Sequence, residues 1–253
     1  MRIGLCLSGG GARGIYHIGA LQFIKEAGIE LDIISGCSAG ALVGVLFSGG
    51  VSPETLLDLS IKTKWFNFLR PALPNKGLMD LNYLEQILTQ NLSKDTFESL
   101  KIPVKVIATN LIAGKLKIFD EGSVIKPVLA SCSVPLLFKP VEIENELYLD
   151  GGILMNFPAS IIREHCDILI GVSLMPVQMV KSDEINNSFK LLTRVLELSV
   201  QNNSKLQMGY CDILIESPKI SQYSKFDLNT AEDLYNLGYQ ATREALEAKF
   251  NSL

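Results

Sequence analysis

Two glycine-rich segments near the start of the chain each lie between an apolar run of strand length and a longer run that suits a helix. Gly9-Gly10-Gly11-Ala12-Arg13-Gly14 follows the strand-like residues 2–7, and Gly36-Cys37-Ser38-Ala39-Gly40 follows the strand-like residues 31–35. Small and aliphatic residues then fill positions 39–47, as in a buried helix. A strand, a tight turn and a helix in this order predict parallel strands joined by crossover helices.

The same alternation continues along the chain and predicts an α/β fold. Strands and helices that alternate build a mostly parallel central sheet flanked by helices. Neither an internal repeat nor a low-complexity linker divides the 253 residues, so we expect a single domain over residues 1–253. The predicted helices cover about 13–27, 53–64, 81–91, 124–131, 186–207 and 230–249, and the further predicted strands cover 104–109, 115–119, 147–149, 167–173 and 212–216.

Composition excludes several classes of protein. Hydrophobic residues make up 47% of the chain, which is enough for a sizeable core. The net charge is −4 and basic residues form no cluster, so nucleic acid is not an expected partner. The chain shows no signal-peptide pattern and no apolar stretch of about 18 residues, so we expect a cytoplasmic protein. Five scattered cysteines without a C-x-x-C pair predict reduced, mostly buried thiols and no zinc site; they are Cys6, Cys37, Cys132, Cys166 and Cys211.

Ser38 occupies a position that can activate a hydroxyl group. A turn this sharp forces the serine into a strained backbone conformation, and Gly36 and Gly40 remove side chains that would collide with the neighbouring strand and helix. The hydroxyl then lies at a helix N-terminus, where free N–H groups stabilise the negative charge of an acyl-transfer transition state. Ser38 is therefore the candidate nucleophile, and the segment from Gly9 to Gly14 is the candidate oxyanion hole. The alternative interpretation is a serine that only caps a helix.

An activated serine needs a base, and the chain offers two histidines and one well-placed aspartate. His17 falls in the first helix and His165 precedes a buried strand, so neither occupies the late loop that a Ser-acid-His triad requires. Asp150-Gly151-Gly152 ends the strand at 147–149, and we expect it at the carboxyl edge of the sheet together with Ser38. A carboxylate at that edge can accept the hydroxyl proton. The alternative interpretation is an ordinary Asp-Gly turn.

Four segments in this order and spacing closely resemble the bacterial patatin-like phospholipases. They are the two glycine-rich segments, Ala130-Ser131-Cys132-Ser133-Val134-Pro135, and Asp150-Gly151-Gly152. The resemblance covers the first 152 residues and implies a three-layer patatin-type α/β fold. It implies a Ser-Asp dyad of Ser38 and Asp150 that hydrolyses a lipid or other acyl ester through an acyl-serine, with Arg13 supporting the oxyanion loop. It implies neither a metal nor a cofactor.

Three other functions stay open at this point. The pattern Gly9-x-Gly11-x-x-Gly14 also fits the dinucleotide-binding fingerprint, although Asp32 stands at the beginning of the second strand and the ribose-binding acid belongs at its end. An acyl-serine can also pass its acyl group to an alcohol or a thiol, which would make the chain an acyltransferase. The third is a regulatory protein on a hydrolase scaffold, a role that would not need an intact serine, aspartate and glycine loop.

Two less regular segments are candidates for movable flaps over a site, Trp65–Asp80 and Met175–Glu184. The aromatic cluster Trp65–Leu69 could contact a membrane surface or acyl chains, and packing in the core is the alternative. The acidic net charge disfavours long-range attraction to anionic membranes, so any contact with a membrane surface would be transient and local.

Overall fold

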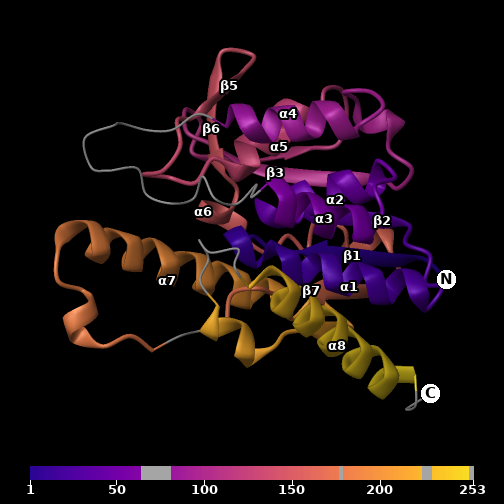
Figure 1. The fold of residues 1–253 in the computed structure, drawn as a ribbon. Coiled ribbons are helices and arrows are strands. Elements are labelled where there is room, and N and C mark those ends of the chain that lie inside the picture. The colour runs from indigo at the N-terminus through magenta and orange to yellow at the C-terminus, as the bar shows by residue number, and fades with distance from the viewer. Residues whose placement is uncertain (64–80, 177–178, 224–229, 251–253) are drawn as a thin grey trace.

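The computed structural model describes residues 1–63, 81–176, 179–223 and 230–250. Within them, eight strands form one mixed sheet, paired in the order β5-β6-β3-β2-β1-β7-β8, with β4 also paired to β3 (Figure 1). Five strands run parallel, as predicted: β1 (Ile3–Leu7), β2 (Ile33–Gly36), β3 (Val104–Asn110), β7 (Ile168–Val172) and β8 (Ile213–Ile215). Three run antiparallel to their partners: β4 (Lys115–Phe119), β5 (Val141–Ile143) and β6 (Glu146–Asp150).

Two strands share one edge of β3, and this arrangement determines where the aspartate lies. Val106 pairs with Gly36 of β2 and also with β4, so β2 and β4 lie on opposite edges of β3. Ala108 pairs with Asp150 of β6 and also with β4, so β6 lies on the same edge as β2. β2 and β6 therefore run toward each other along β3 and meet at their carboxyl ends.

Asp150 lies beside Ser38 for a different reason from the one expected. The carboxyl ends of parallel strands meet at one edge of a sheet, and this rule predicts the aspartate at the edge that carries Ser38. β6 is antiparallel to β3, so that rule does not apply to it. The aspartate reaches the serine because β6 approaches from the opposite direction along the same edge of β3.

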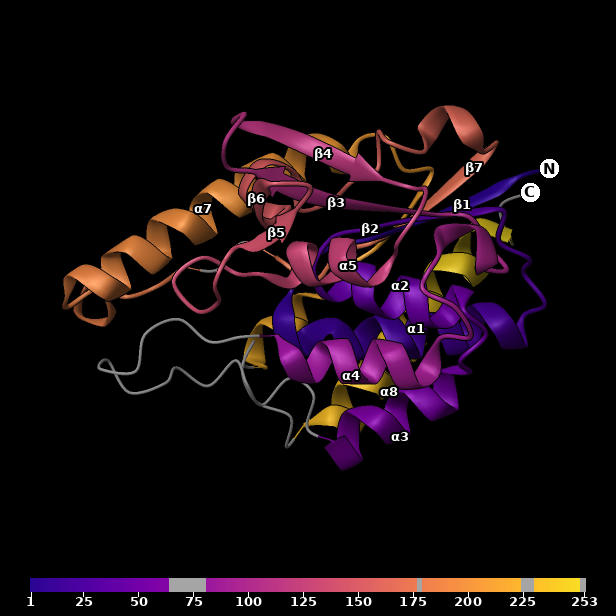
Figure 2. The ribbon, with the colours of Figure 1, turned by 90° about the horizontal axis from the view of Figure 1, so that it is seen from above.

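Helices cover one face of the sheet, and a second set of segments covers the other. In Figure 2 the sheet is seen nearly edge-on, and α1, α2, α3, α4, α5 and α8 all lie on one side of it. Phe157 and Ile162 form a separate apolar cluster with Cys6 on the other face, where Met208 of α7 also packs. The helices are α1 (Ile15–Glu26), α2 (Ala39–Ser48), α3 (Pro53–Thr63), α4 (Asn82–Asn91), α5 (Ile125–Cys132), α6 (Gly152–Met155), α7 (Ser188–Met208) and α8 (Ala231–Phe250).

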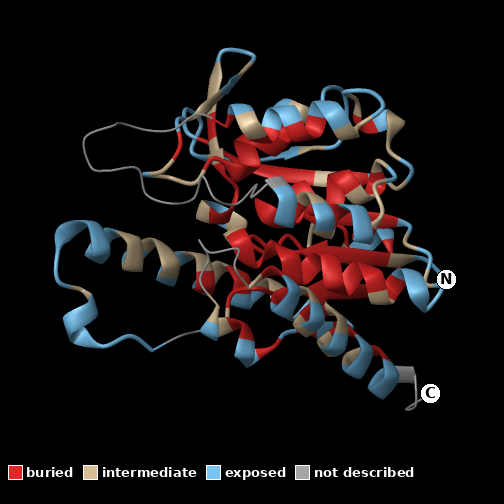
Figure 3. Cartoon of the chain, in the orientation of Figure 1, coloured by how far each residue is buried: buried red, intermediate tan, exposed pale blue. Residues whose placement is uncertain are grey.

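The predicted elements are present, with ends shifted by a few residues, and the core lies where the apolar runs are longest. β1 and α2 are buried over nearly their whole length (Figure 3). Sequence analysis missed β5 and α6, because elements of three or four residues do not complete a recognisable period. It also missed short 3-10 turns at Gly11–Gly14, Phe97–Ser99, Arg163–His165, Ser182–Glu184 and Pro218–Gln222.

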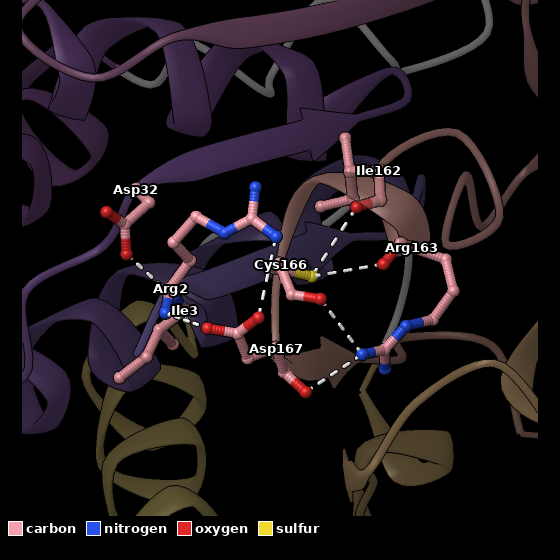
Figure 4. Close-up of polar contacts among 7 residues, drawn as sticks. All are labelled: Arg2, Ile3, Asp32, Ile162, Arg163, Cys166 and Asp167. Carbon is pink, nitrogen blue, oxygen red and sulfur yellow. Dashed lines mark hydrogen bonds and ion pairs between the residues drawn. The ribbon is translucent and has the colours of Figure 1, made fainter.

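Polar contacts tie together the amino-terminal edge of the sheet, opposite to Ser38 (Figure 4). The Asp167 carboxylate accepts hydrogen bonds from the backbone N–H of Arg2 at 2.7 Å and from its guanidinium at 3.4 Å. The Asp32 carboxylate accepts from the Ile3 backbone N–H at 2.6 Å. Arg163 donates to the backbone carbonyl of Asp167 at 2.9 Å. These contacts fix the starts of β1, β2 and β7 relative to one another.

Candidate functional site

Ser38 lies on a strained turn between β2 and α2, as the flanking glycines predict. Its backbone angles are φ 52° and ψ −121°, in a region that residues with a side chain rarely adopt. A Cβ atom on Gly36 would lie 2.7 Å from the Cα of Ala41, and one on Gly40 would lie 2.2 Å from the carbonyl oxygen of Leu7. Both glycines are therefore required by close backbone packing, and Ala39 opens α2 directly after the serine.

The Ser131-Cys132-Ser133 segment at the end of α5 holds the serine and the aspartate together. The backbone N–H of Ser38 donates to the Oγ of Ser131 at 2.8 Å. The Sγ of Cys132 lies 3.4 Å from the carbonyl oxygen of Ser38. The backbone N–H of Asp150 donates to the carbonyl oxygen of Ser133 at 2.9 Å. The segment therefore has a structural role at the site that its sequence did not indicate.

Asp150 lies beside Ser38 at the end of β6, with 6% of the residue exposed. Its Oδ1 accepts a hydrogen bond from the backbone N–H of Gly152 at 2.7 Å and lies 3.5 Å from the Sγ of Cys37. Burial raises the pKa of Asp150 from 3.8 to about 6, and hydrogen bonds from Gly152, Ser38 and Cys37 oppose that rise. At neutral pH the carboxyl group is therefore ionised and still more basic than an exposed aspartate.

The Asp150-Gly151-Gly152 turn is too closely packed for larger residues. A Cβ on Gly151 would lie 2.7 Å from the carbonyl oxygen of Ile107 in β3. A Cβ on Gly152 would lie 2.9 Å from the Oδ1 of Asn156 and 3.0 Å from the Oδ1 of Asp150. Because neither glycine has a side chain, the Asp150 carboxylate can lie directly over the Gly152 N–H that donates to it. The turn is buried and closely packed, so the alternative interpretation of an ordinary surface turn does not describe it.

The glycine-rich loop contributes two of its six residues to the wall of the site. Gly10 and Gly11 line the same cavity as Ser38. The N–H of Gly9 already donates to the carbonyl oxygen of Asn156 at 3.0 Å, so Gly9 is not available as an oxyanion donor. Ala12, Arg13 and Gly14 are buried in the 3-10 turn that leads into α1. Of the six residues of the expected oxyanion loop, Gly10 and Gly11 are therefore the two that line the cavity.

Arg13 connects the loop to later parts of the chain. Its guanidinium group donates to the backbone carbonyl oxygens of Tyr223 at 2.9 Å, Leu174 at 3.3 Å and Ser221 at 3.3 Å. The residue is buried, and burial lowers the pKa of its guanidinium. Arg13 thus supports the loop from behind, through contacts with segments that follow β7 and β8.

Asn156 is a residue of the site that sequence analysis did not find. It is buried at the end of α6, and its Nδ2 lies 3.4 Å from the carbonyl oxygen of Gly9 and 3.3 Å from the Oγ of Ser204 in α7. Its own N–H donates to the Oδ1 of Asn203 at 2.9 Å. Asn156 thus joins the glycine loop to α7. Its position six residues after Asp150 is the one sequence signal that could have drawn attention to it.

Ser38 and Asp150 open into a cavity of about 240 Å³ whose walls are mostly apolar. Leu136 in this wall has a positive φ of 71°, so strained backbone occurs on both sides of the cavity. Side chains of α7 close another side of it, including Phe189 and Glu197. The other apolar wall residues include Val134, Leu137, Ile153, Met175, Leu196 and Val200.

Neither histidine lies where a catalytic base would be needed. The Nε2 of His17 is 2.8 Å from the carbonyl oxygen of Ser8, and complete burial lowers the pKa of His17 to about 4. His165 is exposed and precedes β7, at the edge of the sheet opposite to Ser38. Asp32 lies at that same edge, where Figure 4 shows its carboxylate directed to the Ile3 amide. The triad through His165 and the dinucleotide fingerprint are therefore both inconsistent with the structure.

Other expectations concern metals, cysteines and membrane spans. Among the described residues, no group of three or more His, Cys, Asp or Glu side chains is arranged to hold a metal ion. Four of the five free cysteines are buried, as predicted, and Cys211 is partly exposed. None of the described helices has both the length and the apolarity needed to cross a membrane. The predicted flap at Trp65–Asp80 lies outside the described residues, as does part of the one at Met175–Glu184.

Comparison with known proteins identifies the family. The family model described as patatin-like phospholipase matches residues 5–163, which is more than half of the chain and includes Ser38 and Asp150. The chain belongs to the patatin-like phospholipase family. This confirms the resemblance noted from the four sequence segments.

Named relatives and a solved structure agree with this family. An uncharacterized NTE family protein of Mycobacterium tuberculosis is 33% identical over 177 residues, which cover 68% of this chain and 49% of that protein. Neuropathy target esterase sws of Drosophila melanogaster is 26% identical and is covered over 19% of its length, against 94% of this chain. The chain thus spans half or less of these relatives.

The crystal structure of VipD from Legionella pneumophila shares the fold. It matches with a TM-score of 0.58 at 18% identity, over 98% of this chain and 67% of that one. The patatin-type three-layer α/β fold predicted from the sequence is therefore confirmed.

Proposed function

We propose that this chain is a serine lipid acyl hydrolase that cleaves carboxylic esters with a dyad of Ser38 and Asp150. The observation that carries the proposal is the meeting of a serine on a strained elbow with a buried carboxylate of raised pKa in one apolar cavity. Membership in the patatin-like phospholipase family supports the hydrolysis of ester bonds. A single apolar cluster that includes both Leu5 and Leu246 supports treating residues 1–253 as one domain.

In the proposed mechanism, Asp150 accepts the Ser38 proton as the hydroxyl oxygen attacks the ester carbonyl carbon. The N–H groups of Gly10 and Gly11 stabilise the negative charge that develops on the carbonyl oxygen. Asp150 then returns the proton to the leaving alcohol, and an acyl-serine remains. Water repeats the sequence with the same base, which releases the acid and restores the serine.

The cavity favours an acyl chain over a polar group. Most of its wall residues are apolar, among them Leu137, Met175 and Val200, although the wall also includes the carboxylate of Glu197. An acyl chain placed along such a wall is removed from water, and this stabilises binding in proportion to the apolar area that is buried. The substrate class we propose is therefore a lipid ester such as a phospholipid or lysophospholipid.

The test is covalent labelling with a fluorophosphonate, followed by intact-mass spectrometry and peptide mapping. We expect one adduct on Ser38, none on Ser38→Ala, and labelling of Asp150→Asn slowed by about 10²- to 10⁴-fold, the usual contribution of a general base. Ser199→Ala is the matched control, because Ser199 also lines the cavity and its loss should leave labelling unchanged. An adduct on any other serine would contradict the proposed nucleophile.

The same protein preparations decide between hydrolysis and the two alternatives. Release of free fatty acid from a lipid ester in water supports the hydrolase. Transfer of the acyl group to an added alcohol in preference to water would indicate an acyltransferase. Folded wild-type protein that neither labels nor turns over an ester would indicate a regulatory scaffold.

A further inference from the structure

α7 is apolar on two sides, although the body of the protein covers only one of them. Phe189, Leu196 and Val200 face the cavity. The helix projects beyond the sheet and the other helices in both Figure 1 and Figure 2, and Figure 3 shows its outer surface as partly or fully exposed. A helix that covers a core on one side normally carries polar residues on the other. The outer side of α7 departs from that pattern.

Five exposed aliphatic side chains make the outer side of α7 apolar, and we call them the outer stripe: Leu191, Leu192, Val195, Leu198 and Leu206. Their exposed fractions lie between 45% for Leu192 and 72% for Leu206. Leu191, Val195 and Leu198 follow the spacing i, i+4, i+7, which places them on one side of a helix. None of the five lines the cavity. The stripe is therefore a surface separate from the catalytic wall.

The outer stripe lies next to partly exposed apolar residues of the cavity wall. Phe189 lines the cavity and is still 52% exposed, and Leu136 on the facing wall is 40% exposed. Phe189 lies three residues before Leu192 in α7, so exposed apolar side chains of neighbouring turns reach from the outer stripe to the cavity wall. Exposed apolar side chains grouped in this way mark an interaction site.

The charges of α7 indicate what covers the stripe. The chain as a whole has a net charge of −4, whereas α7 carries three basic residues, Lys190, Arg194 and Lys205, and one acidic residue, Glu197. Arg194 and Glu197 form an ion pair at 3.3 Å. Basic side chains beside an apolar stripe are typical of helices that lie in the interface of a phospholipid layer.

We propose that the outer stripe of α7 inserts into the surface of a phospholipid layer and presents the cavity mouth to lipid acyl esters. The second half of this proposal rests on the proposed function. A second copy of the chain fits less well, because antiparallel pairing of α7 with itself brings Lys190 of one copy near Lys205 of the other. Like charges across an interface disfavour association, whereas lipid phosphates attract both lysines.

The experiment measures vesicle binding by the Ser38→Ala protein, so that no lipid is consumed. Vesicles of phosphatidylcholine with a minor share of phosphatidylglycerol are sedimented with that protein, and the bound fraction is determined. The test variant adds Leu191→Ser, Val195→Ser and Leu198→Ser, and we expect its affinity for vesicles to fall roughly tenfold or more.

A matched control removes the same kind of side chain elsewhere. It adds Ile61→Ser, Ile112→Ser and Ile118→Ser, which are exposed on α3, in the β3–β4 turn and on β4. We expect this control to bind vesicles as the Ser38→Ala parent does. Thermal melts verify that both triple variants are folded.

A second variant tests the charges without altering the stripe. Lys190→Glu with Lys205→Glu should weaken binding to vesicles that contain phosphatidylglycerol and leave binding to pure phosphatidylcholine unchanged. This variant also keeps the proposal testable if the triple serine variant does not fold.

Binding and catalysis are read separately. With Ser38 intact, the stripe variant should hydrolyse a soluble short-chain ester at the wild-type rate and hydrolyse vesicle lipid more slowly. A protein that hydrolyses no ester refutes the proposed function, while the vesicle result on Ser38→Ala still stands.

Two outcomes overturn the surface proposal. The first is equal vesicle binding by the parent and the stripe variant. The second is a parent that does not bind vesicles; if that parent is also a dimer that the stripe variant converts to a monomer, the stripe belongs to a second copy.

Discussion

Replacing Asp150 with asparagine should stabilise the protein while removing the proposed base. The carboxyl group is buried, and its pKa is raised from 3.8 to about 6. A raised acid pKa means that the native state binds a proton more tightly than the unfolded state does. Stability is therefore lost as pH rises from about 4, where Asp150 ionises in the unfolded state, to about 6, where it also ionises in the native state. Asparagine is neutral at every pH and keeps an oxygen that can accept the Gly152 N–H.

The size of the effect follows from the two pKa values. A pKa shift of one unit corresponds to roughly 1 kcal/mol, so the raised pKa of Asp150 costs about 3 kcal/mol of unfolding free energy at pH 8 and about half as much at pH 5. The Asp150→Asn protein should therefore gain roughly 1–2 kcal/mol relative to wild type between pH 5 and pH 8. Any fixed packing difference between the two side chains cancels in this comparison.

The assay is urea unfolding of both proteins at pH 5, 6, 7 and 8, with ester hydrolysis measured in parallel. Asp167→Asn serves as the control, because the Arg2 N–H holds the pKa of that exposed carboxylate below its usual value. Its loss should give no gain that grows with pH. A stability difference for Asp150→Asn that stays constant or shrinks from pH 5 to pH 8 would refute the raised pKa. Full ester hydrolysis by Asp150→Asn would refute the role of the carboxylate as base.

Three further predictions concern the surroundings of the dyad. The rate of ester hydrolysis should fall as pH drops through about 6, where Asp150 becomes protonated. Cys37→Ala should shift this limb of the pH–rate profile to higher pH, because the thiol hydrogen bond lowers the pKa of Asp150. An unchanged limb would exclude an effect of that contact. Gly40→Ala should lower the free energy of unfolding by about 1–3 kcal/mol in urea, because its Cβ would lie 2.2 Å from a carbonyl oxygen of β1. The control Gly209→Ala should be tolerated, because a Cβ there meets nothing within 4 Å. Asn156→Ala should lower kcat for a soluble ester by about tenfold or more, because its side chain no longer fixes the oxyanion loop; unchanged kcat in a folded variant would contradict the positioning role.

The local features of the site could be predicted from the sequence. The elbow at Ser38 depends on Gly36 and Gly40, and its geometry follows from what a Cβ atom at either position would strike. The strand before it and the helix after it are strongly apolar, so both can be recognised from the sequence. These features are determined by residues within one or two turns of each other.

The contacts between distant segments could not be predicted. Ser131 meets Ser38 across 93 residues of chain, and Asn156 meets the glycine loop across 147. Both contacts depend on the register of β3 with its partners, which no local pattern specifies. The position of Asp150 was predicted correctly from an inapplicable rule, because the direction of β6 was not evident from five residues.

In the proposed dyad, the shared edge of β3 explains how a carboxylate could take the place of a histidine. A base that acts directly on Ser38 must lie within hydrogen-bond distance and must be more basic than an exposed aspartate. The end-to-end meeting of β2 and β6 supplies the proximity, and burial of the Asp150 carboxyl group supplies the basicity. Burial alone would raise the pKa of Asp150 further. The hydrogen bonds from Gly152, Ser38 and Cys37 oppose that rise, so the Gly-Gly turn and the residue before the nucleophile help to set the pH range in which Asp150 would act as the proposed base.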